Sequence, residues 1–197
     1  MIILASQSAA RRAMLSAAGV AHEARPAHVD EEGVTEALLA EKAGADRIAD
    51  ALAELKAVKI SRANPTALVI GADSVVVDAE GRLLAKPETR ERATAQLRQL
   101  SGTTHRLVSA AVVAEGGTPV WRAAASAKLT MRPLSDAFIA DYLEREGEAV
   151  LGCVGTYRIE ALGAQLFTRI DGDHFTIRGL PLLALLDYLR VRGELPL

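Results

Sequence analysis

Residues 67–77 read Ala-Leu-Val-Ile-Gly-Ala-Asp-Ser-Val-Val-Val. This apolar, β-branched run is typical of a buried strand, and only the segment around Asp73 interrupts it. A carboxylate in such a run needs cations, hydrogen bonds or a metal ion, because an unpaired buried charge is strongly destabilising. The run therefore predicts either a metal ligand or base at the end of a strand, or a turn aspartate in a hairpin.

Helices and strands alternate on both sides of this run. Further strands are expected at 2–5, 107–113, 121–131 and 165–170. Helices are expected at 9–18, 36–62, 90–100, 135–145 and from 181 to about 192, with Gly44 and Asp46 as a dividing point in the long one. The alternation predicts an α/β fold with a mixed twisted sheet flanked by helices, and we expect a single domain over residues 1–197.

The composition and the first residues argue against several classes of protein. The 197 residues carry a formal net charge of -2 and few aromatic side chains, which argues against a nucleic-acid-binding module. The single cysteine excludes an intrachain disulfide framework. The first residues lack a signal-peptide pattern, and no apolar run reaches the length of a membrane span. We therefore expect a cytoplasmic protein with no membrane and no nucleic-acid partner.

A polar segment, Ser6-Gln7-Ser8, separates the first strand from the first helix. Ser8 is the expected N-cap and Gly19 the expected C-terminal cap. Ser8 and Arg11 share one helical face, so hydroxyls, backbone N–H groups and a guanidinium converge on a point that suits phosphate. The commoner alternative is a capped surface helix with solvated arginines.

Two lysines and an acidic segment are ambiguous by themselves. Lys86 precedes Pro87 on a loop with an extended backbone, from which it would reach a phosphate or simply face solvent. Lys56 lies on the long helix, where lysines are common. The acidic loop at 29–32 would supply a metal ligand or only be solvated.

Several catalytic motifs are missing. The sequence has no phosphate-binding P-loop, no Gly-x-Gly-x-x-Gly, no zinc-ligand spacing and no Gly-x-Ser-x-Gly elbow. A hydrolase that uses carboxylates and Mg²⁺ fits what remains, because Mg²⁺ binds a few carboxylates together with substrate phosphates.

Taken in order along the chain, short motifs resemble the Maf family of nucleoside triphosphate pyrophosphatases. They are Leu4-Ala5-Ser6-Gln7-Ser8 with Arg11-Arg12, Val29-Asp30-Glu31, Leu55-Lys56-Ala57, Gly71-Ala72-Asp73-Ser74, Leu84-Ala85-Lys86-Pro87, Ser101-Gly102-Thr103-Thr104-His105 and Gly179-Leu180-Pro181-Leu182. The resemblance runs nearly end to end. It implies an elongated fold similar to that of inosine triphosphatase, with two lobes around a central cleft.

The same resemblance implies an activity. Family members hydrolyse the bond between the α- and β-phosphates, giving a nucleoside monophosphate and pyrophosphate, with a divalent cation such as Mg²⁺ or Mn²⁺. It also implies a homodimer with a house-cleaning role against non-standard nucleotides. Carried over by position, Asp73 is the proton acceptor, and Glu31 and Asp73 are the metal ligands. The substrate-binding positions are Ser6, Ser8, Arg11, Lys56 and Lys86, and the specificity positions are Ala10, Ser74 and Glu160.

The chain departs from the family pattern at two places. Ala9-Ala10 stands where Pro-Arg is usual, and Tyr157-Arg158-Ile159-Glu160 stands where Tyr-x-Ile-Gln is common. The second segment resembles the branch that acts on 7-methyl-GTP more closely than the dTTP/UTP branch. An ionised glutamate only accepts hydrogen bonds, which suits the adjacent N1–H and N2–H donors of guanine, and a methylated, cationic guanine suits it further.

Two alternatives remain beside a guanine-type pyrophosphatase. The first is a dTTP/UTP pyrophosphatase. The second is a non-catalytic nucleotide-binding regulator of cell division that uses the same residues for binding alone.

Overall fold

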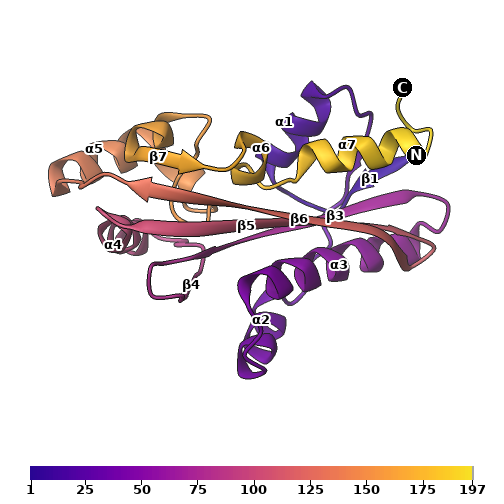
Figure 1. Ribbon diagram of the computed structural model, residues 1–197, viewed down its shortest axis with the longest axis horizontal. Coiled ribbons are helices and arrows are strands. Elements are labelled where there is room, and N and C mark those ends of the chain that lie inside the picture. Colours follow the sequence, from indigo (N-terminus) through magenta and orange to yellow (C-terminus); the bar gives the residue numbers. More distant parts are fainter. Residues whose placement is uncertain (197) are drawn as a thin grey trace. The chain divides into compact units, whose positions relative to one another are not determined.

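The computed structural model describes residues 1–196 and has seven strands in one mixed sheet (Figure 1). The strands are β1 (Ile2–Leu4), β2 (Glu23–Ala24), β3 (Leu68–Val77), β4 (Leu83–Leu84), β5 (Thr104–Glu115), β6 (Thr118–Met131) and β7 (Phe167–Asp171). Their order is β2-β1-β3-β5-β6-β7, with β4 also paired to β3. β1 pairs in parallel with β2 and β3, whereas β4 and β7 pair antiparallel with their neighbours.

Helices separate most of these strands. They are α1 (Ala9–Ala17), α2 (Glu31–Ala40), α3 (Ala45–Ala63), α4 (Arg90–Leu100), α5 (Asp136–Glu146), α6 (His174–Ile177) and α7 (Leu182–Val191), with 3-10 turns η1 (Gly147–Val150) and η2 (Leu162–Leu166). The predicted α/β class, with helices flanking a mixed sheet, is confirmed.

The chain forms two compact units. The first contains residues 1–74, 108–125 and those from 179 onward, and the second contains 75–107 and 126–178. In the first unit, α3 lies on one face of the strands, and α1 and α7 lie on the other (Figure 1). Trp121 of β6 stacks on Tyr188 of α7 with ring centroids 5.1 Å apart, so aromatic packing fixes α7 to its face.

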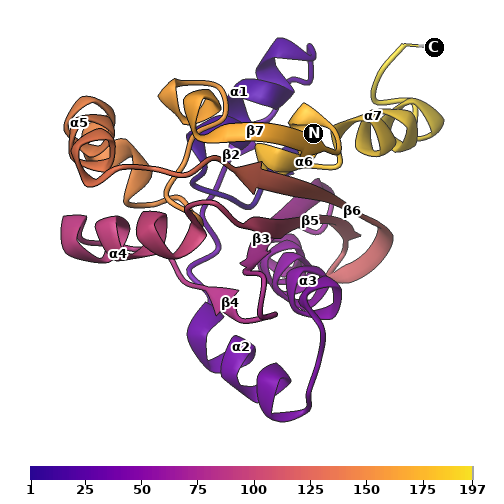
Figure 2. The ribbon, with the colours of Figure 1, turned by 60° about the vertical axis from the view of Figure 1, so that its left-hand side comes forward.

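The long helical stretch expected at 36–62 is two helices, and the division falls where Gly44 and Asp46 suggested it. Figure 2 shows α2 and α3 as separate helices joined by a short connection. The expected start is wrong, because α2 begins at Glu31 with Asp30 as its N-cap, whose Oδ1 accepts from the backbone N–H of Gly33 at 3.0 Å. An aspartate followed by two glutamates is typical of a capped first turn, so the start of α2 could have been predicted from the sequence.

Other boundaries were predicted well. The caps at Ser8 and Ser135 are confirmed, since each hydroxyl accepts from a backbone N–H three residues later. The helix expected at 90–100 has those bounds. β5 and β6 are longer than expected and form a hairpin closed by Gly116 and Gly117, both with positive φ. The short β2, β4 and α6 were not predicted.

The second unit has its own apolar core. Side chains of α4, α5, β5 and β6 form one cluster that includes Leu97, Leu129 and Tyr142. His105 of β5 is buried there, and its Nε2 lies 3.0 Å from the Tyr157 hydroxyl. Burial lowers the pKa of His105 to about 4.

This buried histidine predicts a loss of stability in acid. As pH falls from about 6.5 towards 4, His105 becomes protonated in the unfolded chain but not in the folded chain. The free energy of unfolding therefore falls by about 3 kcal/mol over this range. His105→Gln, which does not titrate, should show a correspondingly flatter decline. Urea unfolding at both ends of this range measures it, with the exposed His174→Gln as control. An equal decline in both variants would contradict the prediction.

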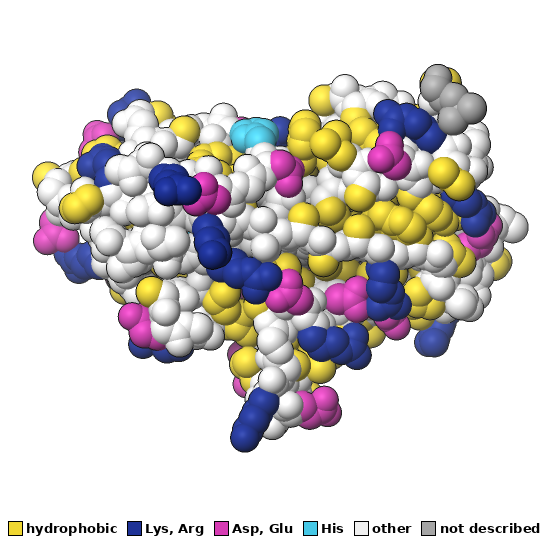
Figure 3. All heavy atoms as spheres, in the orientation of Figure 1, with side chains coloured by type: hydrophobic (Ala, Val, Ile, Leu, Met, Phe, Trp, Pro, Cys, Tyr) yellow, Lys and Arg dark blue, Asp and Glu magenta, His cyan; other side chains and the backbone are white. Residues whose placement is uncertain are grey.

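On the face drawn in Figure 3, basic and acidic side chains are interspersed among uncharged ones. Within residues 1–196, no helix is both long and apolar enough to cross a membrane.

Candidate active site

Asp73 lies in the middle of β3, which is continuous from Leu68 to Val77. The expected interruption at residues 71–74 is wrong, and so is the alternative of a turn aspartate in a hairpin. Because side chains alternate along a strand, Asp73 shares a face with Gly71, and Ser74 points to the opposite face. Asp73 is 7% exposed, so its carboxylate depends on protein partners.

Gly71 explains why α3 lies so close to β3 near Asp73. A Cβ atom at Gly71 would lie 2.1 Å from the carbonyl oxygen of Ala53 and 2.6 Å from the amide nitrogen of Ala57, both on α3. Only glycine permits this approach of helix backbone to strand backbone. The contact places Lys56, on the same stretch of α3, over the Asp73 side chain.

Lys56 joins two carboxylates. Its Nζ lies 2.6 Å from Oδ1 of Asp73 and 2.8 Å from Oε1 of Glu31. The Lys56 and Asp73 side chains are each 9% exposed, whereas that of Glu31 is 42% exposed. Lys56 therefore stabilises a buried negative charge, and Glu31 opens the cluster towards solvent.

The position of Glu31 corrects the expectation of an acidic loop at 29–32. Glu31 is the first residue of α2, after the N-cap Asp30. A helix start holds its side chains more rigidly than a loop does, which favours a fixed carboxylate beside Lys56. Glu32 is exposed.

Arg11 is held by four hydrogen bonds from three parts of the first unit. Its Nε donates to the Gly179 carbonyl at 2.8 Å, and its Nη1 donates to the Ala72 carbonyl at 3.1 Å and to Oγ of Ser6 at 3.2 Å. Its Nη2 donates to Oγ of Ser74 at 3.0 Å. These bonds use four of the five guanidinium N–H groups, so Arg11 offers a fixed positive charge and one further donor.

The strand order explains how Arg11 reaches a backbone carbonyl of β3. β1 ends at Leu4, opposite Ile70, so it does not cover the edge of β3 at Ala72. The chain turns away at Ser6 and enters α1, whose first turn carries Arg11. The carbonyl of Ala72 accepts from Arg11 at this uncovered edge.

The electrostatics of Asp73 and Arg11 are coupled. Burial raises the pKa of Asp73 above its usual value, and the positive charges of Lys56 and Arg11 oppose that shift. Burial likewise lowers the pKa of Arg11, and the Asp73 charge opposes it. Asp73 is therefore a better proton acceptor than an aspartate in water.

The polar residues ahead of α1 are used in its cap. Oγ of Ser8 accepts from the Arg11 backbone N–H at 3.3 Å, and Oγ of Ser6 accepts from the Ser8 N–H at 3.2 Å. Ala10 is half-buried beside Arg11. The first unit thus brings Ser6 and Ser74 to the Arg11 guanidinium, and Ser8 caps the helix that carries Ala10 and Arg11.

Lys86 and Glu160 belong to the second unit. Lys86 is exposed, two residues after β4, and Oε2 of Glu160 lies 3.9 Å from Nε of Arg178. Burial raises the pKa of the Cys153 thiol, with Glu160 adding to the shift and Lys86 opposing it. Both predicted residues therefore lie within electrostatic range of Cys153.

Three contributors were missed from the sequence. They are the carbonyls of Ala72 and Gly179, and Ser109, whose Oγ lies 2.7 Å from Oγ of Ser74. Gly179 has φ +107°, and a Cβ there would lie 2.9 Å from Nε of Arg11. This position requires glycine, so the motif around Gly179 could have indicated the contact. Nothing in the sequence marks Ser109.

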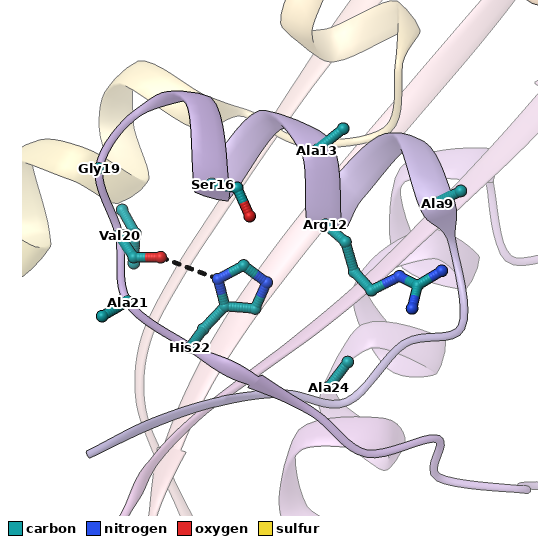
Figure 4. Close-up of a pocket in the computed structure, with 9 residues that line it drawn as sticks. All are labelled: Ala9, Arg12, Ala13, Ser16, Gly19, Val20, Ala21, His22 and Ala24. Atoms are coloured by element: carbon teal, nitrogen blue, oxygen red, sulfur yellow. Dashed lines mark hydrogen bonds between the residues drawn. The ribbon is translucent and has the colours of Figure 1, made fainter.

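A shallow hollow of about 740 Å³ lies between α1 and the segment that follows it, residues 19–24 (Figure 4). Its lining residues are Ala9, Arg12, Ala13, Ser16, Gly19, Val20, Ala21, His22 and Ala24. Arg12 belongs with Arg11 to the predicted cationic helix start, but none of the nine is among the predicted substrate-binding, specificity or metal positions. We therefore assign the candidate site to the Asp73 cluster and not to this hollow.

Comparison with known proteins agrees with the motifs. A family model described as Maf-like protein matches residues 1–192. A relative from Sphingopyxis alaskensis is 54% identical over 195 residues, covering 99% of this chain and 98% of its own. One from Caulobacter vibrioides is 54% identical over 194 residues, covering 98% and 96%, and one from Roseobacter denitrificans is 51% identical over 195 residues, covering 99% and 98%. All three are named nucleoside triphosphate pyrophosphatase. The chain therefore belongs to the Maf family.

Proposed function

We propose that the chain hydrolyses a nucleoside triphosphate between the α- and β-phosphates, with Asp73 as the proton acceptor. The observation that carries the proposal is the Asp73–Lys56–Glu31 cluster, with Arg11 fixed near the same strand. A mere binding protein needs cations for phosphate but no buried carboxylate among them. The activity named for the relatives supports the same reaction.

The residue types suit the chemistry. Asp73 orients the attacking water or accepts its proton, and its raised pKa favours that role. The pyrophosphate leaving group gains negative charge as the bond breaks. We propose that Arg11, Lys56 and Lys86 offset that charge, with Ser6 and Ser8 placing hydroxyls and N–H groups at the phosphates.

Asp73 and Glu31 fit a divalent cation. Both direct a carboxylate oxygen at a single positive charge, the Lys56 ammonium. One or two carboxylates together with substrate phosphates form the usual Mg²⁺ environment. Within the described residues no group of three or more His, Cys, Asp or Glu side chains is placed to hold a metal ion, so phosphate oxygens would complete the coordination. When bound, Mg²⁺ or Mn²⁺ would offset phosphate charge.

For the base, we propose a guanine-type nucleotide, with Glu160 accepting from the N1–H and N2–H groups, and with Ala10 and Ser74 as further specificity positions. The alternative substrates are dTTP and UTP, which offer a single ring N–H. We further propose a cytoplasmic homodimer, as the resemblance implies.

A substrate panel tests this proposal. Purified protein with Mg²⁺ should release pyrophosphate from GTP or 7-methyl-GTP with a higher kcat/KM than from dTTP or UTP. Preference for UTP or dTTP would reject the guanine assignment and leave the reaction standing. Nucleotide binding without pyrophosphate release from any of the four would instead favour the non-catalytic regulator.

A further inference from the structure

Arg178 is the cation paired with Glu160 within the second unit. Its Nε lies 3.9 Å from Oε2 of Glu160, and the two side chains are 19% and 26% exposed. That distance is too long for a hydrogen bond, and Nε, which is buried, has no hydrogen-bond partner in the described residues. Charge alone therefore links the two side chains.

The other nearby arginine has a different partner. Nη1 of Arg158 lies 3.2 Å from Oε2 of the buried Glu146, whose Oε1 accepts from the backbone N–H of Leu162. Arg158 is thus held in a structural ion pair. Among residues 1–196, Arg178 has no other carboxylate partner, so its charge acts on Glu160.

We propose that Arg178 determines specificity by offsetting the charge of Glu160, so that the pair prefers a cationic guanine over a neutral one less strongly than Glu160 alone would. This inference rests on the proposed function, in which Glu160 meets the base. Guanine and 7-methylguanine present the same N1–H and N2–H donors, and the methylated ring carries a positive charge. A lone carboxylate would favour the cationic ring, whereas a carboxylate with an arginine beside it is close to neutral as a pair.

The experiment compares the ratio of kcat/KM for 7-methyl-GTP to that for GTP. We expect Arg178→Met to raise this ratio at least about threefold, because the uncharged side chain no longer repels the cationic base. Glu160→Gln should lower the ratio, and the double variant should return close to the wild type. Arg169→Met is the matched control, since Arg169 is exposed in the same unit and pairs with Asp171.

The sign of the change separates this role from a structural one. If Arg178 only held Glu160 in place, Arg178→Met would lower the ratio, as Glu160→Gln does. A lowered or unchanged ratio in Arg178→Met overturns the inference.

The failure of the proposed function is a different outcome. If the wild type releases no pyrophosphate from either nucleotide, the dissociation constants of 7-methyl-GMP and GMP, measured by calorimetry, give the same ratio. A rise of that ratio in Arg178→Met supports the role of Arg178 without hydrolysis. Binding of neither monophosphate would overturn both proposals.

Discussion

Asp73→Asn should lower kcat/KM for nucleoside triphosphate hydrolysis by on the order of 10²-fold or more, while the protein still folds. Asparagine keeps the size of the side chain and a hydrogen-bond acceptor for Lys56. It loses the negative charge and the ability to accept a proton. Steady-state pyrophosphate release measures the rate, and thermal unfolding checks the fold.

Asp187→Asn is the matched control for this variant. Asp187 is an exposed aspartate of α7 that pairs with Arg190, far in sequence from the cluster, so its activity should equal that of the wild type. A folded Asp73→Asn protein with full activity would refute the role of Asp73 as base.

Gly71→Ala should lower the free energy of unfolding by about 3 kcal/mol, among the larger losses expected for one added methyl group. The new Cβ would meet backbone atoms of Ala53 and Ala57, at 2.1 and 2.6 Å, and backbone does not rotate away as a side chain does. Either α3 moves off β3 or the strand bends. Both changes also separate Lys56 from Asp73, so activity should fall with stability. Urea unfolding gives the free energy.

Gly44→Ala serves as the comparison. Gly44 is the N-cap of α3, a Cβ there meets nothing within 4 Å, and its φ of -76° suits alanine. This change should lower the free energy of unfolding by no more than about 1 kcal/mol, because Gly44 is only a weak N-cap. Equal unfolding midpoints for the two variants would show that the close approach at Gly71 is not needed.

Much of the fold could be predicted from the sequence because buried strands and helices show recognisable patterns of apolar residues. The apolar run of β3 and the capped helices α1, α4 and α5 were found from such patterns. The break placed at residues 71–74 was wrong for a physical reason. Gly71 and Asp73 look like strand breakers locally, but the glycine admits α3 and the aspartate pairs with Lys56, which lies 17 residues earlier.

The candidate site was only partly visible in the sequence. Residue types indicated a cationic helix start at Arg11 and a carboxylate in β3. They did not indicate that most of the Arg11 donors bond inside the protein, because two of its acceptors are backbone carbonyls that every residue possesses. Residue types likewise did not indicate that Lys56 bridges Asp73 and Glu31, since that contact depends on how α2 and α3 pack.

Product analysis in oxygen-18 water tests the central claim most directly. Purified protein is incubated with GTP and Mg²⁺, and phosphorus NMR and mass spectrometry identify the products and the position of the label. We expect the wild type to form a nucleoside monophosphate and pyrophosphate. Asp73→Asn should not form these products at the rate of the wild type. Formation of nucleoside diphosphate and orthophosphate by the wild type would contradict cleavage between the α- and β-phosphates.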